Sequence, residues 1–244
     1  RPDWLGLDPF GAIFSLIPYI LDPLSAPVPD LAALSFFELN DNYFEKWNTL
    51  TDEGIHVTGT VGTDSHQNVL PIPSLVDNER LDGHRRVLRW FSNHYLVSDV
   101  TVDGVKEAVK AGRGWIVTEV IGSPVGMDFY ADAGAAVVGV GDTGAFVPGA
   151  TTIHVPLPTL HPDSPQDGPA PQITIRLKRV LPGGMVYLEI ESVDAPLDFA
   201  ASVAGAYRAE VWIVPNHLTP YLGISPSLFL HETPWILTNH LYLE

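Results

Sequence analysis

The second half of the chain is a succession of short apolar and polar alternations, separated by turns rich in glycine and proline. In one of them, QITIRLKRV, Ile173, Ile175 and Leu177 alternate with polar residues. A period of two places such residues on one face of a β-strand. Repeated strands of this kind predict an antiparallel β-sandwich over residues 123–244. The segments are MDFYADAG, TTIHVPLPTL, QITIRLKRV, GMVYLEIES, AYRAEVWIV and PWILTNHLYLE.

Residues 1–122 have a different pattern, in which strand-like and helix-like segments alternate. Such alternation is typical of an α/β layer or barrel, and we therefore expect two domains, 1–122 and 123–244. The clearest helix is predicted over 103–114, where Asp103 is the expected N-cap and Gly112 the expected stop. The other predicted elements are helices over 41–54 and 77–91 and strands over 34–39, 56–64 and 115–122.

Charge and composition narrow the possible functions. The formal net charge of −16 repels phosphate backbones, so we expect no nucleic-acid partner, and it suits an extracellular or periplasmic protein. The chain contains no cysteine. Any metal must therefore be held by His, Asp, Glu or carbonyl ligands, which favours ions such as Zn, Mn or Fe. The apolar run FGAIFSLIPYIL is shorter than the ~18–20 residues of a membrane span, so we expect no transmembrane segment.

The sequence GTDSH places Asp64 and His66 at the end of the strand predicted over 56–64. Residues i and i+2 of an extended chain point to the same side, so this carboxylate and imidazole can reach one ion. The carboxyl end of a strand is also where α/β folds place their sites. The alternative is structural: Asp64 caps the next segment, and His66 is a surface residue.

The flanking residues resemble the C-terminal part of the PHP (polymerase and histidinol phosphatase) metal-dependent phosphoesterases. The resemblance rests on ELN, KWNTLTDEG and TGTVGTDSH, and continues in VTVDGVKEAVKAGRGWIVTE. GAYRAEVWIV and PWILTNHLYLE resemble the end of a β-rich extension in one secreted branch of that family, with His240 in place of a proline. The resemblance implies that residues 1–122 are the C-terminal portion of a distorted α/β barrel.

The resemblance also implies site residues. Asp64 and His66 would be the last two ligands of a site of divalent ions that activate water to hydrolyse a small phosphate-type substrate. Asn40 and Glu38, at another predicted strand end, are candidates to support the metal ligands or bind substrate. His84, together with His94 and Arg80, could orient a phosphate. The alternative for these last three is that they are exposed helix residues.

The family's His-x-His motif and its further His and Glu ligands are absent from this chain. Two ligands do not complete a catalytic zinc-type site, which takes three protein ligands plus water. We therefore expect the chain to begin about halfway through the PHP domain and to be inactive alone. The N-terminal half would come from a cleaved chain or from an upstream segment of the same polypeptide.

The sequence is compatible with two other functions. A non-catalytic relative would keep a decayed or structural metal site and use its sandwich to bind a partner or glycan. A secreted β-rich binding or assembly protein would use Asp64 and His66 only to cap a strand. Metal bound beside Asp64 and His66 would favour the hydrolase or its non-catalytic relative over the secreted β-rich binding or assembly protein.

Overall fold

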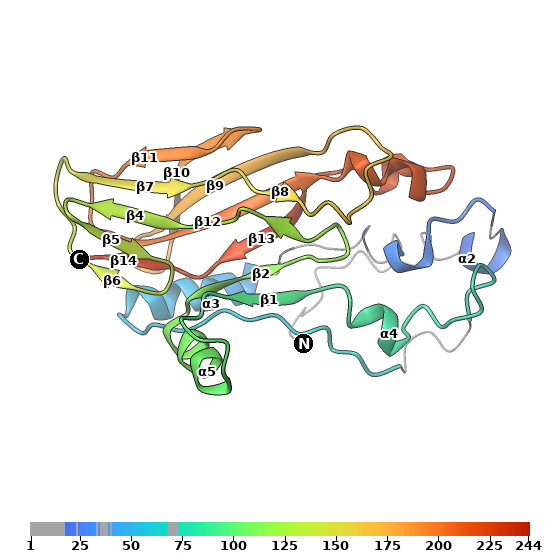
Figure 1. Cartoon of the computed structure of the whole chain (residues 1–244), viewed down its shortest axis with the longest axis horizontal. Coiled ribbons are helices and arrows are strands. Elements are labelled where there is room, and N and C mark those ends of the chain that lie inside the picture. The colour runs from blue at the N-terminus through green and yellow to red at the C-terminus, as the bar shows by residue number, and fades with distance from the viewer. Residues whose placement is uncertain (1–17, 23, 33, 35–38, 40, 68–72) are drawn as a thin grey trace.

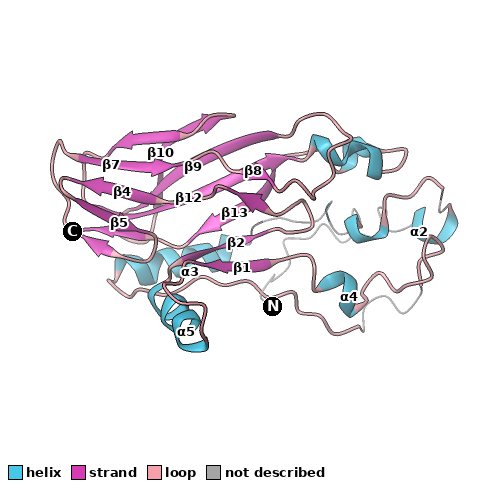
Figure 2. Ribbon diagram, viewed as in Figure 1, coloured by secondary structure: helices cyan, strands magenta, loops and turns pink. Residues whose placement is uncertain are grey.

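The computed structural model describes residues 18–22, 24–32, 34, 39, 41–67 and 73–244. Short helices accompany a body made mostly of β-strands (Figures 1 and 2). The helices and 3-10 helices are α2 (Pro18–Leu21), η1 (Pro29–Leu31), α3 (Asp41–Asp52), α4 (His84–Val87), α5 (Val102–Ala111), η3 (Asn216–Tyr221) and η4 (Pro226–Leu228).

The strands are concentrated after residue 113, and most of them lie in the region 123–244 that the sequence predicted to be rich in strands. They are β1 (Ser92–Tyr95), β2 (Gly114–Val117), β3 (Pro124–Val125), β4 (Tyr130–Ala133), β5 (Ala136–Gly139), β6 (Thr143–Gly144), β7 (Thr151–Val155), β8 (Thr159–Leu160), β9 (Gln172–Val180), β10 (Val186–Val193), β11 (Leu197–Ala200), β12 (Gly205–Val214), β13 (Thr233–Thr238) and β14 (Leu241–Leu243).

These strands form two main sheets within the described residues. The larger has the order β1-β2-β13-β12-β14-β6, and β9 joins it through β12 with β10 beyond; the smaller has the order β11-β7-β4-β5. The pairs are antiparallel except for the parallel pair of β14 and β6, which the antiparallel prediction did not include. Because β1 and β2 precede residue 122 and β2 pairs with β13, the larger sheet continues across that position.

One apolar core lies between the two sheets, which is the arrangement of a β-sandwich. Ile153 and Val155 of β7 belong to the same buried cluster as Ile175 of β9 and Val211 of β12, and none of the four is exposed to solvent. The alternation in QITIRLKRV is confirmed, because Ile173, Ile175 and Leu177 all belong to this core. Burying a side chain of this kind contributes roughly 1.5–3 kcal/mol.

Two of the predicted helices form. The helix expected over 41–54 is α3, followed by Gly54 in the left-handed region with φ 74°. The helix expected over 103–114 is α5, and Gly112, with φ 72°, ends it as predicted. Its N-cap is Thr101 rather than Asp103, because the Thr101 hydroxyl accepts a hydrogen bond of 3.0 Å from the Gly104 N–H.

The prediction of a helix over 77–91 is wrong for most of this segment, since only the four residues of α4 are helical. Asn78 has a positive φ of 58°, and the Ser74 N–H donates to the Glu79 carbonyl in a turn. Ion pairs from Arg85 and Arg86 to the carboxylates of this region favour the turn over a continuous helix. The predicted strand 34–39 lies largely outside the described residues.

The glycine-rich sequence 139–145 connects β5 and β6, which do not pair with each other. β5 before it belongs to the smaller sheet and β6 after it to the larger sheet, so the turn carries the chain from one sheet to the other. The Asp142 N–H donates to the Gly139 carbonyl within the turn. Among the described residues, no helix has both the length and the apolar character that a membrane crossing requires.

Candidate functional site

Asp64 and His66 contact each other on an exposed loop. His66 Nε2 lies 3.3 Å from Asp64 Oδ2, and the two side chains are 45% and 77% exposed, respectively. The strand predicted over 56–64 does not form. Asp64 and Gln67 adopt left-handed backbone conformations, with φ 47° and 48°. The two predicted ligands therefore meet through a turn and not through strand alternation.

The loop is attached to the segment that leads into α4. Ser65 Oγ lies 2.5 Å from His84 Nδ1, and Arg80 Nη2 donates a hydrogen bond of 2.5 Å to the Gln67 carbonyl. The Arg80 guanidinium also pairs with Asp82 at 2.7 Å. His84, the first residue of α4, thus lies beside the predicted ligand pair. Glu38 and Asn40, the other predicted site residues, lie outside the described residues.

Two asparagine side chains hold the extended backbone that leads to this loop. Asn93 Oδ1 accepts from the Val61 N–H at 2.9 Å, and Asn93 Nδ2 donates to the Val61 carbonyl at 2.9 Å. Asn239 binds the Gly59 N–H and carbonyl in the same way, at 2.6 and 3.4 Å. These amides satisfy backbone groups that a strand partner would otherwise satisfy. The segment is therefore positioned without belonging to a sheet.

The donor set fits part of a metal site. A carboxylate and an imidazole are both common ligands of Zn-type ions, and Asp64 and His66 are close enough to share one. In the part of the chain that the structure describes, no group of three or more His, Asp or Glu side chains is arranged to hold an ion. Within these residues, Asp64 and His66 are two donors of the kinds that such an ion takes, without a third beside them.

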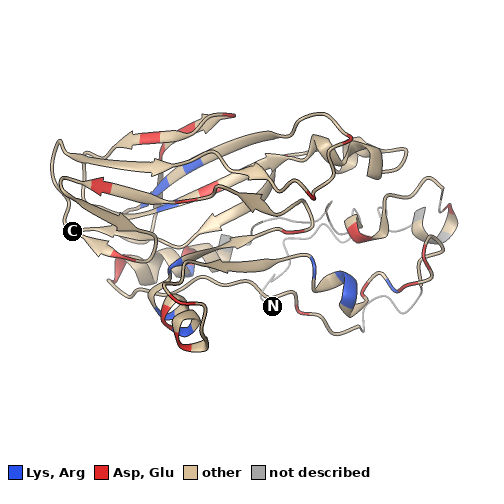
Figure 3. Cartoon of the chain, viewed as in Figure 1, with Lys and Arg blue, Asp and Glu red and all other residues tan. Residues whose placement is uncertain are grey.

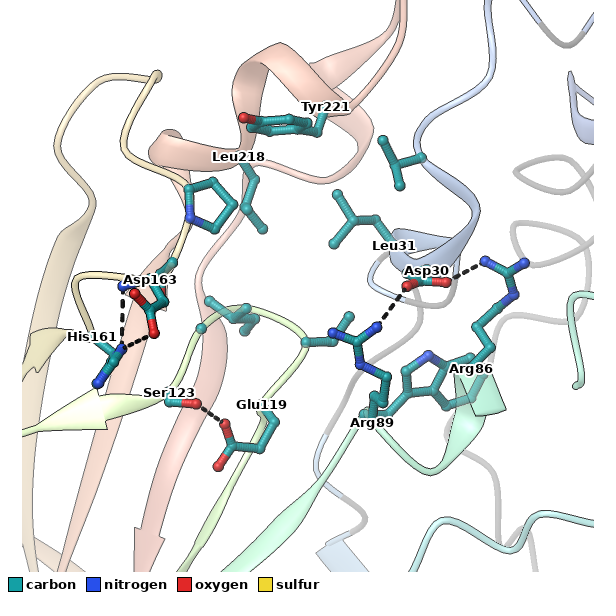
Figure 4. A pocket seen from close by; sticks show the side chains of 17 residues that line it. Asp30, Leu31, Arg86, Arg89, Glu119, Ser123, His161, Asp163, Leu218 and Tyr221 are labelled. Atoms are coloured by element: carbon teal, nitrogen blue, oxygen red, sulfur yellow. Dashed lines mark hydrogen bonds and ion pairs between the residues drawn. The ribbon is translucent and has the colours of Figure 1, made fainter. Parts of the chain in front are cut away.

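A separate cavity of about 510 Å³ lies between the N-terminal helical segments and one end of the sandwich (Figure 4). Residues from five separate parts of the chain line it, and no sequence motif marks it. Its volume is in the range of small-molecule sites. The lining includes Leu31, Arg86, Arg89, Glu119, Asp163, Leu218 and Tyr221.

Three side chains hold the Glu119 carboxylate, which lines this cavity. Its Oε1 lies 2.6 Å from His94 Nε2 and accepts a 2.5 Å hydrogen bond from Ser92 Oγ, while Oε2 accepts from Ser123 Oγ. The bond to His94, helped by those from the two serines and opposed by burial, lowers the pKa of Glu119 to about 2. His94 lies on strand β1 and binds Glu119. The alternative interpretation, in which His94 was an exposed helix residue, is wrong.

Arg86, in α4, and Arg89, just after it, line the cavity on another side from Glu119. Figure 3 shows the basic side chains of α4 in blue. The Arg86 side chain is only 1% exposed and pairs with Asp30 and with Asp77, the latter at 2.7 Å. The Arg89 side chain is 69% exposed and lies 3.7 Å from Asp30. Arg86 is thus neutralised inside the protein, whereas Arg89 faces the cavity.

Two histidines of the sandwich, His217 and His154, have identifiable partners. His217 is buried, with Nε2 2.8 Å from the Ile121 carbonyl, and burial lowers its pKa. His154 Nδ1 lies 2.7 Å from Asp198, and its Nε2 lies 3.3 Å from Asp132, on the smaller sheet. Arg113, which follows Gly112 at the end of α5, pairs with Asp142 at 3.0 Å.

Comparison of the chain with family models, with curated proteins and with solved structures gave no match.

Proposed function

We propose that this chain is part of a metal-dependent hydrolase of phosphate-type esters, in which Asp64 and His66 are ligands of a divalent ion such as Zn, Mn or Fe. The supporting observation is the 3.3 Å separation between His66 Nε2 and Asp64 Oδ2 on an exposed loop. The left-handed backbone at Asp64 and Gln67 adds support, because uncommon conformations of residues other than glycine cluster at functional sites.

The residues of the loop and of the start of α4 have different parts in this proposal. Asp64 and His66 present one carboxylate and one imidazole from the same loop, and Ser65 and Arg80 fix that loop against the start of α4. When bound, a divalent ion lowers the pKa of its water and neutralises charge on the phosphate oxygens. His84, held through Ser65, is placed to support the loop or a substrate oxygen.

Asp64 and His66 supply only two ligands, and the described residues bring no third to them. We propose that an N-terminal half of the same domain brings the remaining ligands, as the resemblance to the PHP phosphoesterases implies, and that residues 1–122 complete a PHP-like barrel with it. Secretion of the complete protein to an extracellular or periplasmic location belongs to the same proposal. The net charge of −16 makes a small substrate more plausible than a nucleic acid.

The test is hydrolysis of bis(p-nitrophenyl) phosphate by the complete protein, supplied in turn with Zn²⁺, Mn²⁺ and Fe²⁺. We expect D64N and H66A each to lower kcat/KM by at least about 100-fold, because residues that only support metal ligands already contribute about 10–100-fold. Both variants should keep the wild-type thermal unfolding midpoint, since both side chains are exposed.

A matched control comes from the smaller sheet, where His154 Nε2 also lies 3.3 Å from an aspartate, Asp132. D132N and H154Q should leave metal-dependent hydrolysis at the wild-type rate. Wild-type turnover in D64N and H66A would refute the proposal, as would equal losses in the control pair.

A further inference from the structure

The cavity between the helical segments and the sandwich has walls that the backbone fixes on two sides. On one side, the Val28 N–H donates to the Tyr221 carbonyl at 2.8 Å, and the Ile224 N–H donates to the Ser25 carbonyl at 3.2 Å. On the other side, the Val120 N–H donates to the Trp90 carbonyl at 3.3 Å. These bonds join the segments around the cavity in pairs and fix their positions. The space between the segments is therefore preformed.

The wall over 119–123 is also held from behind, by buried groups of the sandwich. Trp235 Nε1 donates to the Gly122 carbonyl at 2.8 Å, and His217 Nε2 lies 2.8 Å from the Ile121 carbonyl. Gly122 itself has φ 140°, and an added Cβ would lie 2.7 Å from a Leu160 methyl group. A wall anchored at consecutive residues keeps Glu119 in place, as a preorganised binding site requires.

Opposite charges face each other across this space. Figure 4 shows the guanidinium of Arg89 reaching into the cavity from the α4 side, with Glu119 below it and Asp163 on the sandwich side. Among the described residues, Asp30 at 3.7 Å is the ion-pair partner of Arg89, so most of its donors are available to a ligand. The Asp163 carboxylate is 93% exposed. Leu31, Leu218 and Tyr221 supply apolar surface between these groups.

We propose that this cavity binds a small zwitterion with an apolar body, of the size of an apolar dipeptide. Its carboxylate would accept hydrogen bonds from Arg89, and its ammonium group would donate to Glu119 or Asp163. Its side chains would cover Leu31, Leu218 and Tyr221. A guanidinium and a carboxylate each form their strongest hydrogen bonds with a charged partner.

The charges disfavour simpler ligands. An organic anion would satisfy Arg89 but would meet Glu119 and Asp163 in a protein of net charge −16. An amine would satisfy those carboxylates but would leave Asp30, which Arg86 shares, as the counter-charge of the Arg89 guanidinium. A zwitterion satisfies both walls at once. The site is separate from the Asp64–His66 pair and needs no metal, so it can exist whether or not the chain belongs to a hydrolase.

The test is isothermal titration of the full chain with leucyl-leucine, with N-acetyl-leucyl-leucine, which lacks the ammonium group, and with leucyl-leucine amide, which lacks the carboxylate. We expect leucyl-leucine to bind and each blocked form to bind at least about tenfold more weakly, because each loses a charge-assisted hydrogen bond. In R89Q, leucyl-leucine and its amide should bind equally. R113Q, which removes an exposed arginine outside the cavity lining, should keep the wild-type preference.

E119Q tests the carboxylates on the other side of the cavity, and in this variant the preference for leucyl-leucine over its acetylated form should be reduced. If E119Q fails to fold by circular dichroism, D163N provides the same test at an exposed residue, with a reduced preference for the free ammonium group expected. The proposal is overturned if leucyl-leucine does not bind at 10 mM, if the blocked forms bind as well as the free dipeptide, or if R89Q keeps the wild-type preference. It is also overturned if maltose, a neutral polyol, binds more tightly than leucyl-leucine with an affinity unchanged in R89Q.

Discussion

The side-chain amide of Asn239 binds both backbone polar groups of Gly59, although 180 residues separate the two positions. The same amide donates a 3.0 Å hydrogen bond to the Gly114 carbonyl. Asn239 lies between β13 and β14, at the break in the strand that the sequence predicted as the single segment PWILTNHLYLE. A residue at the interrupted strand thus positions the extended chain that leads to Asp64 and His66.

Replacing Asn239 with alanine should therefore free the extended segment around Gly59 from β13 and β14. Asn239 is buried, and N239A leaves the Gly59 N–H and carbonyl without their partner, while the Gly114 carbonyl keeps the backbone N–H of residue 239. We expect a loss of about 1–3 kcal/mol in the free energy of unfolding, measured by urea denaturation. Amide hydrogen exchange at Gly59 should also accelerate. N216A is the control, because the Asn216 amide makes a single exposed bond, of 3.3 Å to Ala170, and its loss should change stability by less than about 0.5 kcal/mol.

Gly141 and Gly126 provide a matched pair for steric exclusion. Both have a positive φ, of 82° and 77°, so alanine incurs a similar backbone cost at each. A Cβ at Gly141 would lie 2.4 Å from the Ala111 carbonyl oxygen, whereas a Cβ at Gly126 meets nothing within 4 Å. We expect G141A to destabilise the protein by about 1–3 kcal/mol more than G126A in urea denaturation. Equal losses would show that the sheet-to-sheet turn adapts freely around α5.

His240 should make the fold sensitive to mild acid. Burial, followed by the nearby Arg208 and His56, holds its pKa well below the usual value of 6.5. Neither ring nitrogen has a hydrogen-bond partner among the described residues, and Trp47 packs against the ring at 4.6 Å. The unfolded chain binds a proton as pH falls below about 6.5 while the folded chain does not, so stability is full above that pH and decreases below it.

The measurement is the urea midpoint between pH 7.5 and pH 4.5 for the wild type and for H240F, which keeps a ring against Trp47. We expect the midpoint of H240F to depend less on pH in this window. H161F removes an exposed histidine and should keep the wild-type pH dependence. A wild-type slope in H240F would contradict the assignment.

Glu119 acts in a lower pH window. Its pKa is lowered to about 2, chiefly by the hydrogen bond to His94, so its ionised form stabilises the folded state. That contribution is fully present above the usual pKa of about 4.5 and is lost as pH falls towards 2. E119Q should therefore be less stable than the wild type at pH 7, by about 1–3 kcal/mol for the lost charge-assisted bonds, and the difference should shrink below pH 4.5. A difference that stays constant from pH 7 to pH 2.5 would exclude this role.

The elements that the sequence predicted correctly are those whose signals are local. The alternation of Ile173, Ile175 and Leu177 identifies β9, and Gly54 and Gly112 mark the ends of α3 and α5. The predictions failed where distant contacts decide the conformation. The segment 56–64 has the residues of a strand, but asparagine side chains hold it instead of a neighbouring strand.

The candidate sites divide in the same way. The sequence alone identified Asp64 and His66 as a possible ligand pair, because both residues lie within three positions of one another. Only the tertiary structure brought His84 to Ser65, and only it assembled the cavity in which Arg89 faces Glu119 and Asp163. Those residues come from segments far apart in the chain, and no local pattern of side chains encodes which segments will pack together.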